Sequence, residues 1–208
     1  MGQGSWLTWL EGPSCVHVDI GGELFPHDVL RLCGDRENII YLTHLDWDHI
    51  SFAKRFYQQA PSTCVVPNFQ SQKGKAKVFL SRLPRCPPLK TLRVQSLYQP
   101  KRFINANQAS TFYSVNNKVL ITGDAPQSEE RNWVRINPSI MDILILGHHG
   151  SHTSTSKELL QRVRPKLSIA SARKEKFGHP HKKTRELLKQ FKVPLLTTQS
   201  WGHIYLDL

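Results

Sequence analysis

The stretch Thr43-His44-Leu45-Asp46-Trp47-Asp48-His49 carries four side chains that can bind a metal, at the spacing His-x-Asp-x-Asp-His. The apolar and partly β-branched run 38–42 directly before it predicts a buried strand. A loop that leaves a core strand holds its side chains in fixed positions. Imidazole together with carboxylate suits zinc, manganese or iron better than calcium or magnesium. Aspartate and histidine at this density have no structural use in a polar turn, so the stretch predicts a metal-binding loop.

Three further loops repeat this pattern at the ends of predicted strands. They are Gly123-Asp124 after strand 118–122, the run 147–152 with His148 and His149 after strand 143–146, and Gly178-His179-Pro180-His181 after strand 167–172. A lone aspartate is more often a helix cap, and a lone histidine is more often a surface residue. Four strand ends of the same character instead predict one rim where loops converge on a metal centre.

The rest of the chain alternates between strands and helices. Further strands are expected at 14–19, 64–66, 111–115, 195–198 and 204–206, and helices at 52–60, 156–163 and 184–191. Residues 23–36 are expected to form a short helix or loop, and residues 68–102 strands and loops with little regular helix. Asn116-Asn117 between two apolar runs is typical of a tight β-hairpin. With 208 residues, the chain fits one layered α/β domain better than two small ones.

The positive charge is concentrated in one part of the chain. Between His49 and Gly123 there are 12 lysines and arginines and no acid, while the remaining 16 basic residues are balanced by 16 acidic ones. The whole net charge of +12 therefore belongs to one contiguous third. A solvated basic face rarely extends so far without an acid. The segment favours a surface for a polyanion, of which nucleic acid is the commonest.

The cysteines and the hydropathy limit the classes of protein to which the chain can belong. Cys15, Cys33, Cys64 and Cys86 are far apart and show no C-x-x-C pairing, which excludes a zinc knuckle. We interpret them as buried free thiols, and leave one disulfide open. No apolar run approaches the length of a membrane span, and the start of the chain has neither the basic nor the apolar region of a signal peptide.

Several motifs together resemble the metallo-β-lactamase superfamily: Asp19-Ile20-Gly21-Gly22, the 43–49 stretch, Gly123-Asp124 and His148-His149-Gly150-Ser151. Within it, the chain is similar to the C-terminal domain of the ComEC family of competence DNA-uptake channel proteins, through Gly2-Gln3-Gly4, Asn107-x-x-Ser110 and the 178–181 run. The resemblance covers nearly the whole chain. It implies an αββα sandwich with a two-metal hydrolase site between its sheets. Because Met1 stands where the family's first strand is already running, we expect an excised domain whose parent has transmembrane helices upstream.

The resemblance also implies roles for individual residues. One metal would be held by His44 and Asp46, and the other by Asp48, His49 and one of His148 and His149, with Asp124 bridging the two. Asp48 would orient the nucleophile, and His179 would donate to the phosphate oxygen or to the leaving group. Asp19 is expected to brace a ligand. The residues expected to contact substrate are Asn107, Ser151, His179, Lys73, Lys75 and Lys77. A structural role is the alternative for His152 and His181, and we favour it for His203.

Three departures from the superfamily pattern affect the choice of metal and the local structure. Asp46 occupies a position that most members fill with histidine, and Asn107 stands where relatives carry a further histidine. A more anionic, harder ligand set shifts the preference of the site for its two divalent ions from zinc towards manganese or magnesium, and we expect manganese to be favoured over zinc. Ile50-Ser51-Phe52 replaces the usual Ile-Gly-Gly, which changes the start of the following helix but not the ligands.

The sequence thus predicts a metal-dependent nuclease that acts on DNA during uptake in natural transformation, with no small-molecule cofactor. Its partners would be DNA and the transmembrane channel domain of its parent. The domain itself would be soluble and lie on the extracytoplasmic side, towards the periplasm or cell surface. Two alternatives remain open, a small-molecule phosphodiesterase or esterase of the same fold and a non-catalytic DNA-guiding domain. The first gives no reason for the acid-free segment, and the intact ligand set argues against the second.

Overall fold

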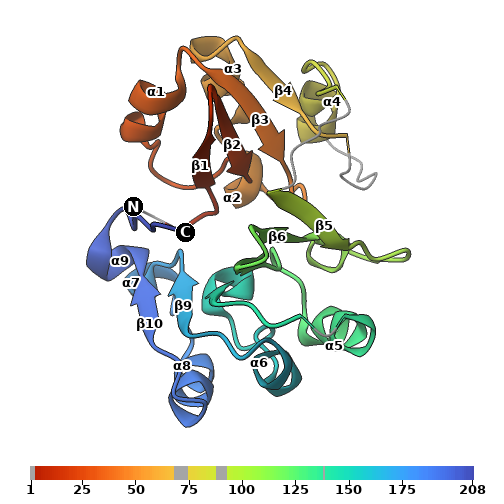
Figure 1. The fold of residues 1–208 in the computed structure, drawn as a ribbon, viewed down its shortest axis with the longest axis vertical. Helices are drawn as coiled ribbons and strands as arrows, with labels where there is room; N and C mark the ends of the chain where they lie inside the picture. Colours follow the sequence, from red (N-terminus) through yellow and green to blue (C-terminus); the bar gives the residue numbers. More distant parts are fainter. Residues whose placement is uncertain (1–2, 68–74, 88–92, 138) are drawn as a thin grey trace. The chain divides into compact units, whose positions relative to one another are not determined.

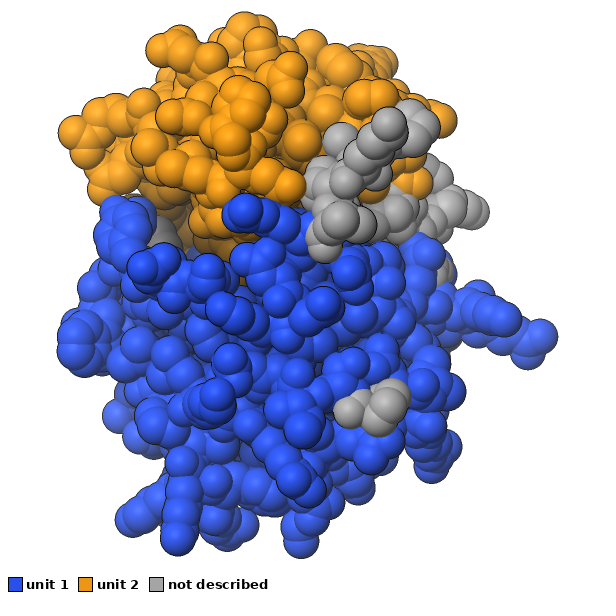
Figure 2. Space-filling model, in the orientation of Figure 1, with its two compact units in different colours: residues 1–3, 91–208 blue, residues 4–90 orange. Residues whose placement is uncertain are grey.

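The computed structural model contains two β-sheets and describes residues 3–67, 75–87, 93–137 and 139–208. The chain divides into two units, which are coloured separately in Figure 2. One consists of residues 4–90, and the other of residues 91–208 together with Met1–Gln3. Each unit contains one sheet with helices packed against it (Figure 1). The predicted combination of strands and helices is therefore present in both halves of the chain.

The sheet of unit 4–90 has the strand order β1-β2-β3-β4. The strands are β1 (Leu7–Glu11), β2 (Ser14–Val18), β3 (Glu37–Tyr41) and β4 (Thr63–Val65). The first two strands are antiparallel, and β2, β3 and β4 are parallel, so the chain must return between them through α1 (His27–Cys33) and α3 (Ala53–Gln59). Phe56 of α3 is fully buried in the same apolar core as Ile40 and Leu42. This unit also contains the short helices α2 (Trp47–Ile50) and α4 (Lys75–Leu80).

The second unit has a six-stranded sheet in the order β10-β9-β8-β7-β6-β5. Its strands are β5 (Val94–Tyr98), β6 (Phe112–Val115), β7 (Val119–Ile121), β8 (Ile143–Ile145), β9 (Leu167–Ala170) and β10 (Leu195–Thr197). Strands β7 to β10 are parallel, whereas β5, β6 and β7 form an antiparallel meander. The carboxyl ends of the four parallel strands therefore lie along one edge, where loops of an α/β sheet commonly carry function.

Three amphipathic helices supply the other half of this unit's core. They are α5 (Gln127–Ile136), α6 (Lys157–Val163) and α8 (Lys182–Gln190). Trp133, Leu160 and Leu188, one from each helix, are buried in one cluster with Phe112 and Leu144 of the sheet. Short helices follow at η1 (Asn107–Ala109), η2 (Gly147–Gly150), α7 (Lys174–Phe177) and α9 (Thr198–Trp201). In the described part of the chain, no helix combines the length and the apolar character that crossing a bilayer requires.

Most predicted elements are confirmed, and the differences are local. Asn116 and Asn117 have φ angles of 52° and 54°, as the two-residue hairpin between β6 and β7 requires. The strand predicted at 204–206 is wrong, because the chain turns into α9 after β10 and residues 204–208 form no regular structure. Helix α4 lies in the region that we expected to contain little helix, and β1 and α5 were not predicted.

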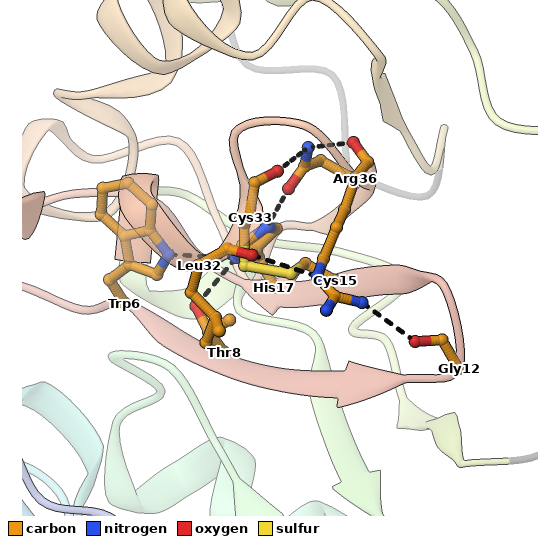
Figure 3. The surroundings of a disulfide bond; sticks show 9 residues. Trp6, Thr8, Gly12, Cys15, His17, Leu32, Cys33 and Arg36 are labelled. Atoms are coloured by element: carbon orange, nitrogen blue, oxygen red, sulfur yellow. Dashed lines mark hydrogen bonds between the residues drawn. A yellow bond between two sulfur atoms is a disulfide. The ribbon is translucent and has the colours of Figure 1, made fainter. Parts of the chain in front are cut away.

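The interpretation of the cysteines as free thiols is wrong. The chain contains disulfides Cys15–Cys33 and Cys64–Cys86, with Cα–Cα distances of 5.9 and 4.9 Å. The first joins β2 to the end of α1, next to Trp6, Thr8 and His17 (Figure 3). Partners that lie 18 and 22 residues apart meet only because the chain folds back against the strand that carries the first cysteine, so their spacing in the sequence did not reveal the pairing.

Candidate functional site

In unit 4–90 the 43–49 stretch leaves the carboxyl end of β3, as predicted, and its backbone is fastened on both sides. The amide of Ser5 donates to the carbonyl of Asp48 at 2.9 Å, and the amide of Ile20 donates to that of His49 at 2.7 Å. Gly21 passes so close that a Cβ there would lie 2.4 Å from the Asp48 carbonyl oxygen. Glycine is therefore required at this position, which explains part of the Asp-Ile-Gly-Gly motif.

Asp19, at the carboxyl end of β2, braces this loop as expected. Its Oδ2 accepts a hydrogen bond from His49 Nδ1 at 2.7 Å, and its Oδ1 accepts from the amide of Thr43 at 2.8 Å. The Asp19 side chain is completely buried, and its backbone has φ 58°, an uncommon conformation that often occurs at functional sites. With its proton on Nδ1, the imidazole of His49 presents the lone pair of Nε2, which is how metal-binding histidines are usually oriented.

The other ligand candidates of this unit lie near His49. The rings of His44 and His49 have their centroids 4.1 Å apart, and His44 Nε2 lies 3.6 Å from Asp46 Oδ2. His44 Nδ1 is 3.0 Å from the hydroxyl of Thr43, the residue that Asp19 also binds. Two imidazoles and a carboxylate are therefore gathered at the end of one strand.

The second unit gathers Asp124, His148 and His149 in the same way, at the carboxyl ends of β7 and β8. His148 Nε2 and His149 Nε2 lie 3.8 and 3.9 Å from Asp124 Oδ2. The amide of Asp124 donates to Ser110 Oγ at 3.1 Å, and that of His148 donates to the carbonyl of Gly123 at 3.1 Å. Both histidine side chains thus reach the aspartate, and the sequence left open which of the two binds metal.

His149 is oriented by the backbone of the neighbouring strand end. Its Nδ1 donates to the carbonyl of Ser171 at 2.8 Å, so Nε2 again keeps its lone pair. His148 and His149 have φ angles of 48° and 55°, so two successive non-glycine residues adopt the left-handed conformation. This strain persists only where surrounding contacts fix the turn.

His179 lies close to this turn, with its ring centroid 6.0 Å from that of His148. Burial, together with the neighbouring imidazoles of His148, His149 and His181, lowers the pKa of His179 from 6.5 to about 4. The ring is therefore neutral at neutral pH and can donate a hydrogen bond through one nitrogen. Its Nδ1 is buried and makes no hydrogen bond within the described part of the chain.

The remaining candidates are the residues expected to contact substrate, namely Ser151, Asn107 and three lysines. Ser151 is buried, and its hydroxyl contacts Thr153 Oγ1 at 3.0 Å. Asn107 begins η1 and accepts the amide of Ser110 with its carbonyl oxygen. Lys73 lies outside the described residues, and for Lys75 and Lys77 only the helical backbone of α4 is described.

His152, His181 and His203 have ordinary contacts. The side chain of His181 caps α8 by accepting from the amide of Lys183, and its ring centroid lies 4.6 Å from that of His152. His203 stacks against Tyr205.

Sequence reasoning missed Glu130 of α5. Its carboxylate is completely buried and accepts the amides of Thr155 at 2.7 Å and Ser156 at 2.6 Å. Gln127 of the same helix donates to the carbonyl of His152 at 3.1 Å. Helix α5 therefore holds the segment that follows the His148–His149 turn. Nothing in the sequence marks Glu130, because its partners are backbone groups.

The residues fit divalent metal ions. Each unit offers a mixture of imidazole nitrogen and carboxylate oxygen, and in each unit one imidazole has its Nδ1 bound to a fixed acceptor. Such an acceptor on the far nitrogen is the usual companion of a metal-binding histidine. Both sets lie at carboxyl ends of parallel strands, the position that the sequence predicted.

Both sheets are mixed, and candidate ligand loops follow the parallel strands of each, which is the arrangement expected from the resemblance to the metallo-β-lactamase superfamily. No family model matches the chain. It is 28% identical over 184 residues to ComE operon protein 3 of Bacillus subtilis (strain 168), a match that covers 79% of this chain and 24% of that protein. It is 40% identical over 89 residues to Recombination protein 2 of Haemophilus influenzae, covering 42% of this chain and 11% of that protein.

The chain thus spans at most about a quarter of the length of these relatives. A solved structure with a TM-score of 0.48 and 14% identity is that of a diphosphatase from the PhnP family, and the match covers 79% of this chain and 71% of that one. The homologues confirm the resemblance to the ComEC group, and the two sheets with their helices confirm the predicted α/β class.

Proposed function

We propose that this chain is the catalytic, metal-dependent phosphodiesterase part of a larger membrane protein for DNA uptake, and that it hydrolyses DNA. The observation that carries the proposal is the pair of braced imidazoles, His49 on the Asp19 carboxylate and His149 on the Ser171 carbonyl. Bracing of this kind, in loops that also carry carboxylates, supports hydrolytic metal chemistry over a purely structural role. The competence and recombination proteins that the chain resembles support DNA as the substrate.

In this proposal both units belong to one catalytic domain that works with two divalent ions. In unit 4–90 the residues that would hold metal are His44, Asp46, Asp48 and His49. In the second unit they are Asp124 and one of His148 and His149. When bound, two such ions supply Lewis acidity to the phosphate oxygens and lower the pKa of the attacking water.

The chain's own residues position the reacting groups. Asp19 keeps His49 from rotating, through its bond to Nδ1. Asp48 accepts a hydrogen bond from the attacking water and so orients it towards phosphorus. His179, neutral because burial lowers its pKa, donates a hydrogen bond to a phosphate oxygen. Ser151 and Asn107 are the further residues that we propose to contact the substrate.

The acid-free basic segment is proposed to bind the sugar-phosphate backbone. Its described members Lys54, Arg55, Arg82 and Arg85 are exposed in unit 4–90, and Arg93, Lys101, Arg102 and Lys118 are exposed in the second unit. Such side chains can pair with phosphates at little desolvation cost, which supplies affinity without sequence preference.

The two disulfides support an extracytoplasmic location, because cytosolic reductants keep thiols reduced while the periplasm and cell surface favour disulfides. We therefore place the domain outside the cytoplasm, attached to a transmembrane channel domain of the parent protein.

Hydrolysis of single- and double-stranded DNA under manganese, magnesium, zinc or chelator tests the proposal. Wild type should degrade DNA with metal and not with chelator, and Asp48→Ala and Asp124→Ala should abolish this. Asp28→Ala and Asp142→Ala are matched controls, one in each unit, since both carboxylates are exposed and pair with the exposed side chains of Arg31 and Lys166. DNA binding without hydrolysis by wild type would indicate a guiding domain. Full activity in both site variants would refute the proposed centre.

A further inference from the structure

One large aromatic side chain in the ligand loop is left in solvent. Trp47 lies between Asp46 and Asp48 and is 66% exposed. By contrast, Trp6, Phe25, Phe52 and Phe56 of the same unit are packed together. Trp6, for example, contacts Phe25 and Phe56 edge to face, with centroids 5.8 and 5.3 Å away. Trp47 therefore does not contribute its ring to the aromatic cluster of its own unit.

The backbone that carries Trp47 is fixed on both sides. Trp47 is the first residue of α2, and the amide of His49 donates to the carbonyl of Asp46 at 3.0 Å. The carbonyl of Asp48 is held by Ser5, as described above. An aromatic ring on a fixed backbone loses little conformational entropy when it binds a partner, so it is preorganised for contact.

A single exposed hydrophobic residue is normal on a protein surface. Trp47 differs from such residues in its position. Both of its neighbours in the chain are candidate metal ligands, and each neighbouring Cα is only about 3.8 Å away. A phosphodiester held at those carboxylates through metal therefore brings its attached nucleosides within reach of the indole ring.

We infer that Trp47 is a stacking platform for an unpaired nucleobase next to the scissile phosphate. The inference rests on the proposed function and specifies its substrate as single-stranded DNA, or duplex ends whose bases are unpaired. Every base has a π face, so stacking on an indole is tolerant of sequence. The bases inside a duplex are already stacked and paired, and an enzyme that needs one must first extrude it at an energetic cost.

The test measures the affinity of the full chain for two oligonucleotides of equal length and charge, in manganese and with phosphorothioate linkages to prevent turnover. One is oligothymidylate, and the other is an abasic oligomer. Trp47→Ala should weaken oligothymidylate binding by between about 5-fold and about 150-fold, the range measured for loss of one base–aromatic stack. It should weaken binding of the abasic oligomer much less, and Trp47→Phe should restore part of the loss.

Trp201→Ala is the matched control, because Trp201 is 67% exposed but lies in α9, away from the ligand loops of either unit in the sequence. It should leave both affinities unchanged. Wild type should also bind the single strand more tightly than its duplex, and Trp47→Ala should reduce that preference. Stacking of a base should quench part of the tryptophan fluorescence of wild type. This quenching should be absent in Trp47→Phe, which lacks the indole ring.

Equal losses for the thymidylate and abasic oligomers, or no loss for either, would overturn the inference while leaving DNA hydrolysis untouched. Conversely, wild type that stacks thymidylate through Trp47 but never cleaves DNA would refute the proposed nuclease and keep the binding site. A loss in Trp201→Ala as large as in Trp47→Ala would also overturn the inference, since it would indicate non-specific aromatic contact.

Discussion

Replacing Glu130 tests whether α5 holds the loop behind the His148–His149 turn. The buried carboxylate accepts the amides of Thr155 and Ser156, and Thr155 has φ 58°, which is unusual for a β-branched residue. Each buried amide that is left without an acceptor costs about 1–3 kcal/mol. Because Glu130→Ala removes two hydrogen bonds and leaves both amides without an acceptor, it should lower the free energy of unfolding by about 3–5 kcal/mol.

The same carboxylate should make stability depend on pH. Burial raises the pKa of Glu130 from 4.5 to about 7, although the hydrogen bonds from Ser156 and Thr155 oppose this shift. Between these two values the folded chain binds more protons than the unfolded chain, so stability falls as pH rises. The contribution of Glu130 is thus complete below pH 4.5 and is lost as pH rises through about 7. A shift of this size corresponds to on the order of 3 kcal/mol.

Urea unfolding of wild type and Glu130→Gln between pH 5 and 8 measures this effect, because the amide cannot titrate. The free energy of unfolding of wild type minus that of Glu130→Gln should fall by on the order of 3 kcal/mol across this range. Glu186→Gln, at an exposed ion pair with Lys182 on α8, is the matched control and should give a flat difference. If the Glu130 difference is also flat, or rises with pH, the carboxylate is not buried as described.

Three further predictions concern the metal, the basic segment and the second buried titratable group. Hydrolysis should be faster with manganese than with zinc at matched occupancy, and a zinc-only enzyme would contradict this. A plot of log DNA affinity against log salt concentration should have a slope on the order of −3 or steeper. The slope should flatten when Lys73, Lys75 and Lys77 are changed to Glu. An unchanged slope would indicate that these lysines do not contact phosphate and belong to a solvated face. Burial lowers the pKa of His17 from 6.5 to about 4, so its contribution to stability is lost as pH falls between these values. Unfolding of His17→Gln should accordingly depend less on acid than that of wild type, and equal acid dependence of the two would refute this.

The positions of the candidate ligand loops could be predicted because two constraints coincide in the sequence. A metal needs particular side chains, and a parallel sheet places them after the carboxyl ends of its strands. Asp19, the 43–49 stretch, Asp124 and the His148–His149 turn all follow strands that the apolar pattern identified. The hairpin at Asn116-Asn117 was predictable for a related reason, since few residues tolerate its backbone conformation.

The errors concern features that depend on distant parts of the chain. Cys15 meets Cys33 only after α1 has formed and the chain has returned to the sheet, so neither cysteine shows its partner locally. The apolar run 204–206 resembles a strand in composition but has no strand to pair with after the chain enters α9. Local pattern indicates what a segment can become, and tertiary contacts decide among these possibilities.

Asp19 and Glu130 show, within the candidate functional site, which supporting contacts the local sequence can and cannot predict. Both are buried carboxylates that accept backbone amides of a ligand-bearing segment, Asp19 from Thr43 and Glu130 from Thr155 and Ser156. The role of Asp19 could be expected because Asp19 belongs to the Asp-Ile-Gly-Gly motif, one of those through which the chain resembles the superfamily. Glu130 lies 25 residues before its partner Thr155, on a helix of mainly polar sequence. A backbone amide can be satisfied by an acceptor from any part of the chain, so no motif specifies which residue supplies it. The candidate metal ligands are therefore recognisable in the sequence, whereas part of what holds them in place can be identified only in the fold.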